Sequence, residues 1–131
     1  MVIQADTGTV TFYLHANYGD VHYKCTADFR SHVCYNLVRF DNKISSVKWS
    51  GLPPSGRYHG HSKIAFFTDN GCKGTVRAWP TVEHGYPSDL ELDGIDNQMS
   101  SFAIWTSGKD VVTKKDLRDE CQELNILERP Q

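Results

Sequence analysis

The chain has 131 residues, of which 39% are hydrophobic and 11% aromatic, so it can bury one core of ordinary domain size. Fourteen Lys and Arg residues against sixteen Asp and Glu give a formal net charge of −2, a balance that excludes nucleic acid as an expected partner. No apolar run approaches the roughly 20 residues of a membrane helix, which excludes a membrane span. We therefore expect one soluble, monomeric domain over residues 1–131, and Met1–Thr7 shows no signal-peptide pattern.

The first part of the chain predicts short antiparallel β-strands. Residues 10–14 alternate Val, Phe and Leu with Thr and Tyr, which is the period-two pattern of a strand that is buried on one face. Residues 47–49 repeat this alternation after glycine-containing turns. We expect residues 9–50 to form a first Greek key, followed by a connector at 51–62 that is rich in Gly, Pro and Ser.

The second part of the chain repeats the first. The hexapeptide Asp-Asn-Lys-Ile-Ser-Ser at 41–46 returns as Asp-Asn-Gln-Met-Ser-Ser at 96–101, and the aromatic segment at 11–15 has a counterpart at 65–69. We expect residues 63–106 to form a second Greek key. The predicted fold class is therefore all-β, a sandwich of two Greek-key motifs.

The tail, residues 107–131, departs from the strand pattern. Thr113-Lys114-Lys115-Asp116 resembles a helix-capping box. The apolar residues that follow fall on one helical face, and they are Leu117, Cys121, Leu124 and Leu127. We expect a C-terminal helix from about 113 to 128 that docks on the sandwich.

Four cysteines, Cys25, Cys34, Cys72 and Cys121, contain no C-x-x-C pair, which argues against a zinc knuckle or a thioredoxin-like site. An even number suits two disulfides, and reduced, buried thiols are equally compatible with the sequence. Three connectivities are open. Proximity along the chain favours Cys25 with Cys34, which leaves Cys72 for Cys121. Disulfides would favour an extracellular location.

The repeated hexapeptide offers the chemistry of a calcium site. Ca²⁺ takes six to eight oxygen ligands from carboxylates, amide and backbone carbonyls, hydroxyls and water. One such loop cannot complete this sphere, whereas two loops that face each other across a pseudo-twofold axis can form two equivalent sites. The alternative is structural, with both loops shaping turns or corners without metal.

These repeats resemble the βγ-crystallin superfamily, in particular its microbial, single-domain, calcium-binding branch. Tyr13–Gly19 and Phe67–Gly74 look like that family's aromatic turn. Residues 41–46, the first clamp, and 96–101, the second clamp, look like its (Asn/Asp)-(Asn/Asp)-x-x-(Ser/Thr)-Ser motif. The resemblance covers residues 9–106 and implies a βγ-crystallin-like sandwich that holds two Ca²⁺ ions.

The resemblance also implies the calcium ligands. The third residue of each clamp would give its backbone carbonyl and the fifth its hydroxyl, while the first two shape the loop and add oxygen. The first turn of each unit would add a further ligand. The implied ligands are His15, Asp41, Asn42, Lys43 and Ser45 for the first unit and Asp69, Asp96, Asn97, Gln98 and Ser100 for the second. With few carboxylates per site, we expect dissociation constants on the order of 10⁻⁵ to 10⁻⁴ M.

The remaining features of the sequence do not indicate a transition-metal site or a catalytic site. His59, His61 and His84 fit no closed tetrahedral metal set, and no nucleophile elbow, zinc-protease helix or P-loop is present, so we expect no enzyme. Cys72 stands where the family has an aromatic residue in the second turn. The second hypothesis for function is a secreted effector, toxin or enzyme inhibitor that uses the sandwich as a scaffold and binds a protein target.

Overall fold

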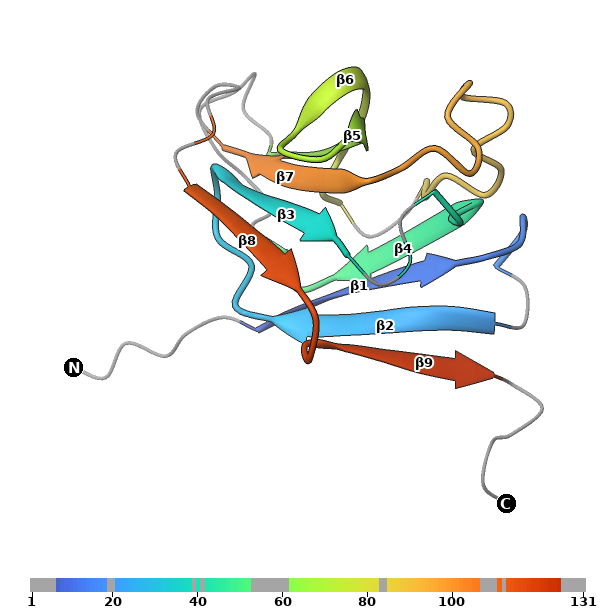
Figure 1. Cartoon of the computed structure of the whole chain (residues 1–131), viewed down its shortest axis with the longest axis horizontal. Helices are drawn as coiled ribbons and strands as arrows, with labels where there is room; N and C mark the ends of the chain where they lie inside the picture. Colours follow the sequence, from blue (N-terminus) through green and yellow to red (C-terminus); the bar gives the residue numbers. More distant parts are fainter. Residues whose placement is uncertain are drawn as a thin grey trace.

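The computed structural model describes residues 7–18, 21–38, 40, 42–52, 62–82, 85–106, 111 and 113–125. Nine strands in these ranges form two sheets, a four-stranded one with the order β4-β1-β2-β9 and a five-stranded one with the order β6-β5-β7-β3-β8 (Figure 1). The strands are β1 Gly8–Tyr13, β2 Val21–Ala27, β3 Val33–Leu37, β4 Ser46–Ser50, β5 Lys63–Asp69, β6 Lys73–Pro80, β7 Ser101–Trp105, β8 Thr113–Leu117 and β9 Cys121–Asn125. The predicted all-β sandwich is confirmed for this part of the chain.

Strand β1 lies inside the four-stranded sheet and shows the alternation that the sequence predicts. Val10 and Phe12 are fully buried, whereas Thr11 between them is partly exposed. Phe12 is opposite Tyr23 of β2 and Val47 of β4 in the antiparallel register. Burial of this apolar face against the second sheet is the main stabilising contribution of the strand.

The two halves of the chain interlock through β3. This strand belongs to the first half, yet it pairs antiparallel with β7 in the five-stranded sheet. A segment of the second half reaches back to β4, where the Val47 N–H donates to the Pro87 carbonyl at 3.2 Å. Within the first half, β4 returns to lie beside β1, as the fourth strand of a Greek key does, while β3 has moved into the other sheet. The predicted boundary 9–50 covers β1 to β4 except for Gly8, and 63–106 covers β5 to β7. Residues 53–61 of the predicted connector lie outside the described residues.

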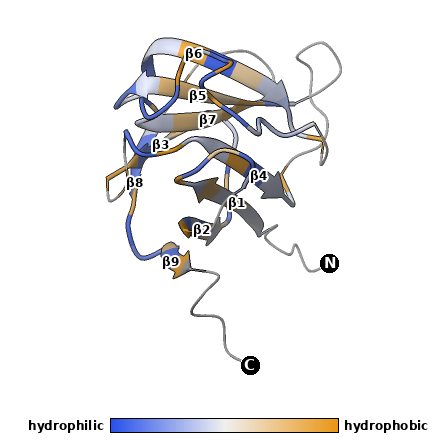
Figure 2. Ribbon diagram, turned by 90° about the vertical axis from the view of Figure 1, so that its right-hand side faces the viewer, coloured by the Kyte–Doolittle hydropathy of each residue, from blue (hydrophilic) through white to orange (hydrophobic). Residues whose placement is uncertain are grey.

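Aromatic rings from both halves fill the space between the sheets. Phe12 and Phe66 hold matching places in the repeat, and their ring centroids lie 5.6 and 6.0 Å from that of Phe102. Figure 2 shows the sheets as two layers, with β5, β6 and β7 above and β1, β2 and β9 below. Trp49 is buried in the same core. The main core is therefore shared between the repeats, and the second repeat adds a small cluster of its own, made of Ala65, Phe67, Ala103 and Trp105.

The predicted C-terminal helix is wrong. Residues 113–117 form β8, which pairs parallel with β3, and residues 121–125 form β9, which pairs antiparallel with β2. Leu117 and Cys121 are buried, as the helical spacing required, but they lie at the end of one strand and the start of the next. The open edges of β2 and β3 offer backbone hydrogen bonds, and this pairing overrides the local helical pattern. Leu127 lies outside the described residues. Within the described residues, no helix is long and apolar enough to cross a membrane.

The cysteines are oxidised, but both predicted pairings are wrong. Cys25 bonds to Cys121, and Cys34 bonds to Cys72. Cys25 in β2 and Cys121 in β9 are direct partners in the strand register. Cys34 is close to Cys25 in sequence, but its strand β3 belongs to the other sheet. The strand exchange that interlocks the halves therefore separates the two cysteines that chain proximity favours.

Candidate metal centre

The two clamps lie against each other, and each ends on the first residue of a strand, Ser46 of β4 and Ser101 of β7. The Asn42 N–H donates to the Met99 carbonyl at 2.8 Å, and the Asn97 N–H donates to the Ile44 carbonyl at 3.0 Å. Each bond is the counterpart of the other when the two halves are exchanged. A pseudo-twofold axis therefore passes between the clamps.

The polar side chains of the clamps meet in the same reciprocal way. Ser45 Oγ donates to Asn97 Oδ1 at 3.4 Å, and Ser100 Oγ donates to Asn42 Oδ1 at 3.3 Å. We refer to the first pair of oxygens as the Ser45 site and to the second pair as the Ser100 site. Each site combines a hydroxyl with an amide oxygen, one from the first half of the chain and one from the second half.

These oxygen separations suit two ligands of one calcium ion. Two oxygens that each lie about 2.4 Å from a cation, at an angle of about 90°, are about 3.4 Å apart. The observed contacts are long for O–H···O hydrogen bonds, which usually measure about 2.7–2.8 Å. A cation that replaces them therefore removes only weak hydrogen bonds, and hydroxyl and amide oxygens are ligands that Ca²⁺ accepts.

The second residue of each clamp is an asparagine for a backbone reason. Asn42 and Asn97 have φ values of 61° and 55°, in the left-handed region that most L-residues avoid and asparagine tolerates. The same residues present their amide oxygens to the opposite clamp. Asparagine thus supplies both the bend and an oxygen.

The last serine of each clamp fixes the first turn of its own half. Ser46 Oγ donates to the His15 carbonyl at 2.6 Å, and Ser101 Oγ donates to the Asp69 carbonyl at 2.5 Å. These bonds hold both carbonyls beside the clamps, while the side chains of His15 and Asp69 are exposed. A carbonyl that accepts one hydrogen bond keeps a second lone pair, so either carbonyl can still bind a cation.

Ser46 and Ser101 are positioning residues that the predicted ligand set omits. Both are fully buried, and a buried hydroxyl requires a partner. Their signal in the sequence is identity between the two clamps, which Ser45 and Ser100 share. The sequence pattern therefore marks all four serines alike, and only their burial and partners separate the two roles.

The remaining predicted ligands have fewer contacts that locate them at the clamps. Asp96 has a buried carboxylate oxygen, Oδ1, without a hydrogen-bond partner among the described residues, while its Oδ2 accepts a hydrogen bond from Asn97 Nδ2 at 3.2 Å. Burial of an unpaired carboxylate oxygen is costly unless a cation or water contacts it. Lys43 and Gln98 have exposed side chains, which leaves their backbone carbonyls as the groups to consider. Asp41 lies outside the described residues.

The centre is built mainly from neutral oxygens. In the ranges that the structure describes, no group of three or more His, Cys, Asp or Glu side chains is arranged to hold a metal ion. His59, His61 and His84 lie outside these ranges, so the expectation that they form no closed metal set stays a prediction. The clamps and their turns are consequently the candidate for a hard, oxygen-seeking cation.

Tyrosines border the first turn. Burial raises the pKa of Tyr13, and the neighbouring Tyr18 raises it further. Burial also raises the pKa of Tyr18. The two rings are 5.5 Å apart, and Lys48 Nζ lies 4.1 Å from the centroid of the Tyr18 ring. Both phenols are therefore neutral at physiological pH and place no negative charge beside the turn.

Comparison with known proteins assigns the fold. No protein-family model and no curated protein matches the sequence. A solved structure from work on the evolution of the eye-lens βγ-crystallin domain fold matches this chain with a TM-score of 0.53 and 20% sequence identity. The match covers 81% of this chain and 93% of the chain in that structure. The chain has the βγ-crystallin domain fold.

Other βγ-crystallin domains are similar to this βγ-crystallin fold. A double mutant of a domain from Clostridium beijerinckii has a TM-score of 0.48 and 22% identity, over 74% of this chain and 96% of its own. A βγ-crystallin from an archaeon has a TM-score of 0.45 and 28% identity, over 73% of this chain and 95% of its own. The match with a TM-score of 0.53 confirms the predicted resemblance as a βγ-crystallin fold, and the ligand set within it stays a prediction.

Proposed function

We propose that this chain is a non-enzymatic, calcium-binding protein of the βγ-crystallin type, in which two Ca²⁺ ions bind between the clamps and stabilise the fold. The observation that carries the proposal is the reciprocal pairing of Ser45 with Asn97 and of Ser100 with Asn42. A turn or a corner requires hydrogen bonds within one loop. It does not require that each loop present a hydroxyl and an amide oxygen to the other.

The neighbouring groups supply further oxygens. The carbonyls of His15 and Asp69 are held at the clamps by buried serines, and Asp96 contributes a carboxylate oxygen without a partner among the described residues. Lys43 and Gln98 would add backbone carbonyls, and water would complete each sphere. Ca²⁺ supplies the positive charge that draws these oxygens together. Because few carboxylates are present, binding on the order of 10⁻⁵ to 10⁻⁴ M follows.

Calcium binding of this kind couples to folding, since each site takes ligands from both halves of the chain. An unfolded chain does not hold the two clamps together, so the ion binds the native state preferentially. At a hundredfold excess of calcium over the dissociation constant, each site would add about 2.7 kcal/mol to the free energy of unfolding. Two filled sites would therefore shift the thermal midpoint by several degrees or more.

The test is thermal unfolding of the full chain in millimolar calcium and in excess chelator. We expect a higher midpoint with calcium, half of the gain in Ser45→Arg or Ser100→Arg, and the full gain in the control Ser50→Arg. Ser50 is exposed at the end of β4, outside the clamps. An unchanged wild-type midpoint, together with no calcium bound in equilibrium dialysis, would reject the proposal.

The two disulfides support an oxidising location, with the extracellular space as our proposal. Recovery of the protein from a secreted fraction with both bonds intact would test it. The second hypothesis, a scaffold for a protein target, invokes the histidine-bearing connector, the long second turn around Pro80 to Asp93 and a C-terminal helix, in whose place the structure has β8 and β9. Because residues 53–61 lie outside the described residues, that hypothesis stays a prediction.

A further inference from the structure

The first turns of the two halves are alike in backbone but differ in one side chain. Tyr18 and Cys72 hold matching places, with φ values of 60° and 58°. Both donate their backbone N–H to the last serine of the clamp, at 3.1 Å to Ser46 and 3.0 Å to Ser101. The residue at this place therefore links the turn to the clamp in both halves.

In the first turn, noncovalent contacts hold the Tyr18 side chain. Its hydroxyl donates to the Tyr86 carbonyl at 3.0 Å, and its ring packs against Tyr13 and lies beneath Lys48. None of these groups changes its covalent state with the redox potential. The first turn should accordingly keep its position in reducing and oxidising solutions alike.

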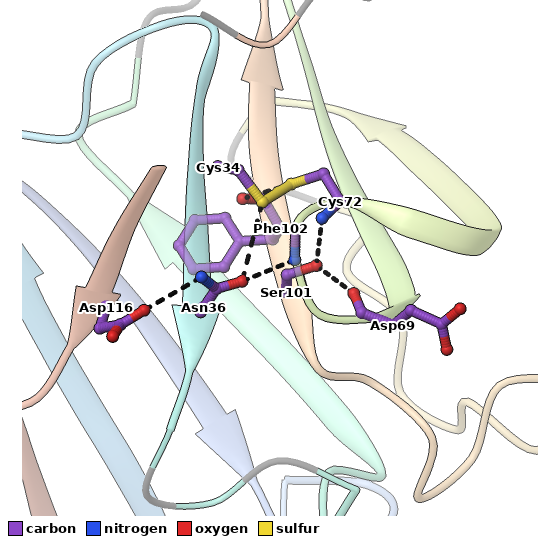
Figure 3. The surroundings of a disulfide bond; sticks show 8 residues. Cys34, Asn36, Asp69, Cys72, Ser101, Phe102 and Asp116 are labelled. Carbon is purple, nitrogen blue, oxygen red and sulfur yellow. Dashed lines mark hydrogen bonds between the residues drawn. A yellow bond between two sulfur atoms is a disulfide. The ribbon is translucent and has the colours of Figure 1, made fainter. Parts of the chain in front are cut away.

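In the second turn, a covalent bond holds the matching residue. Cys72 forms a disulfide with Cys34 of β3 (Figure 3). Asn36 of the same strand accepts a hydrogen bond from the Gly71 N–H at 2.8 Å and donates one to Asp116 at 3.0 Å. Gly71 and Cys72 are consecutive left-handed residues of this turn, and both are tied to β3.

A short path of hydrogen bonds joins the disulfide to the Ser100 site. The Cys72 N–H donates to Ser101 Oγ, which donates to the Asp69 carbonyl (Figure 3). The adjacent Ser100 N–H donates to the Phe67 carbonyl at 2.9 Å, in the strand that leads into the turn. A shift of this turn therefore changes the distance between the Asp69 carbonyl and the Ser100 hydroxyl.

We propose that the Cys34–Cys72 disulfide is a redox-sensitive positioning device for the Ser100 site, while the Ser45 site is independent of it. The inference rests on the proposed calcium function and assigns a regulation to one of its two sites. Cys72 is partly exposed, whereas Cys34, Cys25 and Cys121 are buried. A small thiol therefore has more direct access to Cys72 than to the Cys25–Cys121 bond.

The chemistry is thiol–disulfide exchange with a small dithiol as the reductant. A thiolate of the dithiol attacks one sulfur, the S–S bond between Cys34 and Cys72 breaks, and a mixed disulfide forms. The second thiol of the reductant then displaces the protein sulfur. Two electrons and two protons pass to the protein, which gains two thiols, and the dithiol becomes a cyclic disulfide. The turn thereby loses its covalent link to β3.

The experiment uses full-length variants that keep one site each. Ser45→Arg keeps the Ser100 site, and Ser100→Arg keeps the Ser45 site. Calcium affinity is measured by competition with a chelating dye, with and without dithiothreitol, and the thiols are counted by alkylation and mass spectrometry. We expect the dithiol to weaken the Ser100 site by about tenfold or more, a change of about 1.4 kcal/mol, and to leave the Ser45 site unchanged.

Cysteine variants test the same point without a reductant. Cys34→Ala with Cys72→Ala should lower the affinity of one of two sites, as the dithiol does. Cys25→Ala with Cys121→Ala is the matched control, because it removes the disulfide between β2 and β9, outside the clamps and their turns. This control should keep both affinities although it is less stable. The Ser45→Arg protein with dithiol supplies the answer should either double variant fail to fold.

The possible results separate the two proposals. Unchanged affinity of the Ser100 site, with the Cys34 and Cys72 thiols shown to be reduced, overturns this inference and leaves the calcium function standing. Equal weakening of both sites, or the same weakening in the Cys25/Cys121 control, also overturns it, since the effect is then general loosening. No calcium bound by the oxidised wild type rejects the proposed function, and this inference with it.

Discussion

The two first turns reach the same backbone geometry by different means. Tyr18 is held by a phenol hydrogen bond and ring packing, and Cys72 is held by a disulfide to β3. Both nevertheless adopt a left-handed conformation and donate to a buried clamp serine. The clamp serines therefore fix the backbone of each turn, whereas the side chain of Tyr18 or Cys72 determines whether that turn is sensitive to the redox potential.

The largest expected effect comes from the disulfide that belongs to neither turn. The sequence separation of Cys25 and Cys121 is 96, and the loop-entropy relation assigns about 4.7 kcal/mol to such a cross-link. We expect Cys25→Ala with Cys121→Ala to lower the free energy of unfolding by up to this amount in urea titrations without calcium. Loss of a calcium site in this variant would show that stability and turn position are not separable.

Removal of the Cys34–Cys72 disulfide should lower stability less than removal of the Cys25–Cys121 disulfide, but it should weaken calcium binding more. The separation of Cys34 and Cys72 is 38, which corresponds to about 3.9 kcal/mol. We expect Cys34→Ala with Cys72→Ala to be more stable in urea than the Cys25/Cys121 variant, yet to lose affinity at one calcium site. A reversed order of stability would mean that local contacts at the turn outweigh loop entropy.

A smaller effect should follow from the hydrogen bond that assists the disulfide. Asn36→Ala removes the acceptor of the Gly71 N–H and should lower the free energy of unfolding by about 1–2 kcal/mol. Backbone amide shifts in NMR spectra should concentrate around residues 69–73 and around Asp116 of β8, which loses the hydrogen bond from Asn36 Nδ2. Gln122→Ala, at an exposed position of β9, is the control and should change neither quantity.

The first turn has its own counterpart to this test. Tyr18→Phe keeps the ring beneath Lys48 and removes the hydroxyl that donates to the Tyr86 carbonyl, which should cost about 1 kcal/mol. Urea titration measures the change. Dithiothreitol should not alter the size of this loss of stability, and a loss that grows under reducing conditions would contradict the independence of the first turn.

The smallest effect concerns alkaline pH. Burial raises the pKa of Tyr13, Tyr18 and Tyr35 above the unfolded value of about 10, so the unfolded chain releases these protons first. Their contribution to stability is complete below pH 10 and is lost as the pH rises through the folded pKa values. Tyr18→Phe should make this alkaline loss less steep in urea titrations across that range. An identical slope would show that Tyr18 does not take part.

The paired clamps could be predicted from the sequence because their signal is local and repeated. Asn42 and Asn97 need no distant partner to favour a left-handed bend, and the matched serines identify the loops that belong together. The aromatic alternation around Phe12 likewise predicts a strand from neighbours alone. These features depend on short-range chemistry, which a sequence displays directly.

The tail and the disulfides could not be predicted, because they depend on which strand edges are open. Leu117 and Cys121 have a spacing that fits a helix. The tail forms strands because it pairs with the edges of β3 and β2. The pairing of Cys34 with Cys72 follows from the exchange of β3 into the other sheet. Such information resides in the assembled sandwich, beyond the reach of periodicity.

The bond between Cys25 and Cys121 also bears on how the protein is made. During synthesis Cys25 and Cys34 emerge in close succession, Cys72 follows later, and Cys121 comes last. An oxidase that acts on the growing chain therefore meets first a pair of thiols that the finished protein does not join. Native pairing requires either that oxidation wait for β9 or that a disulfide isomerase reshuffle the early bond, a process that takes seconds to hours.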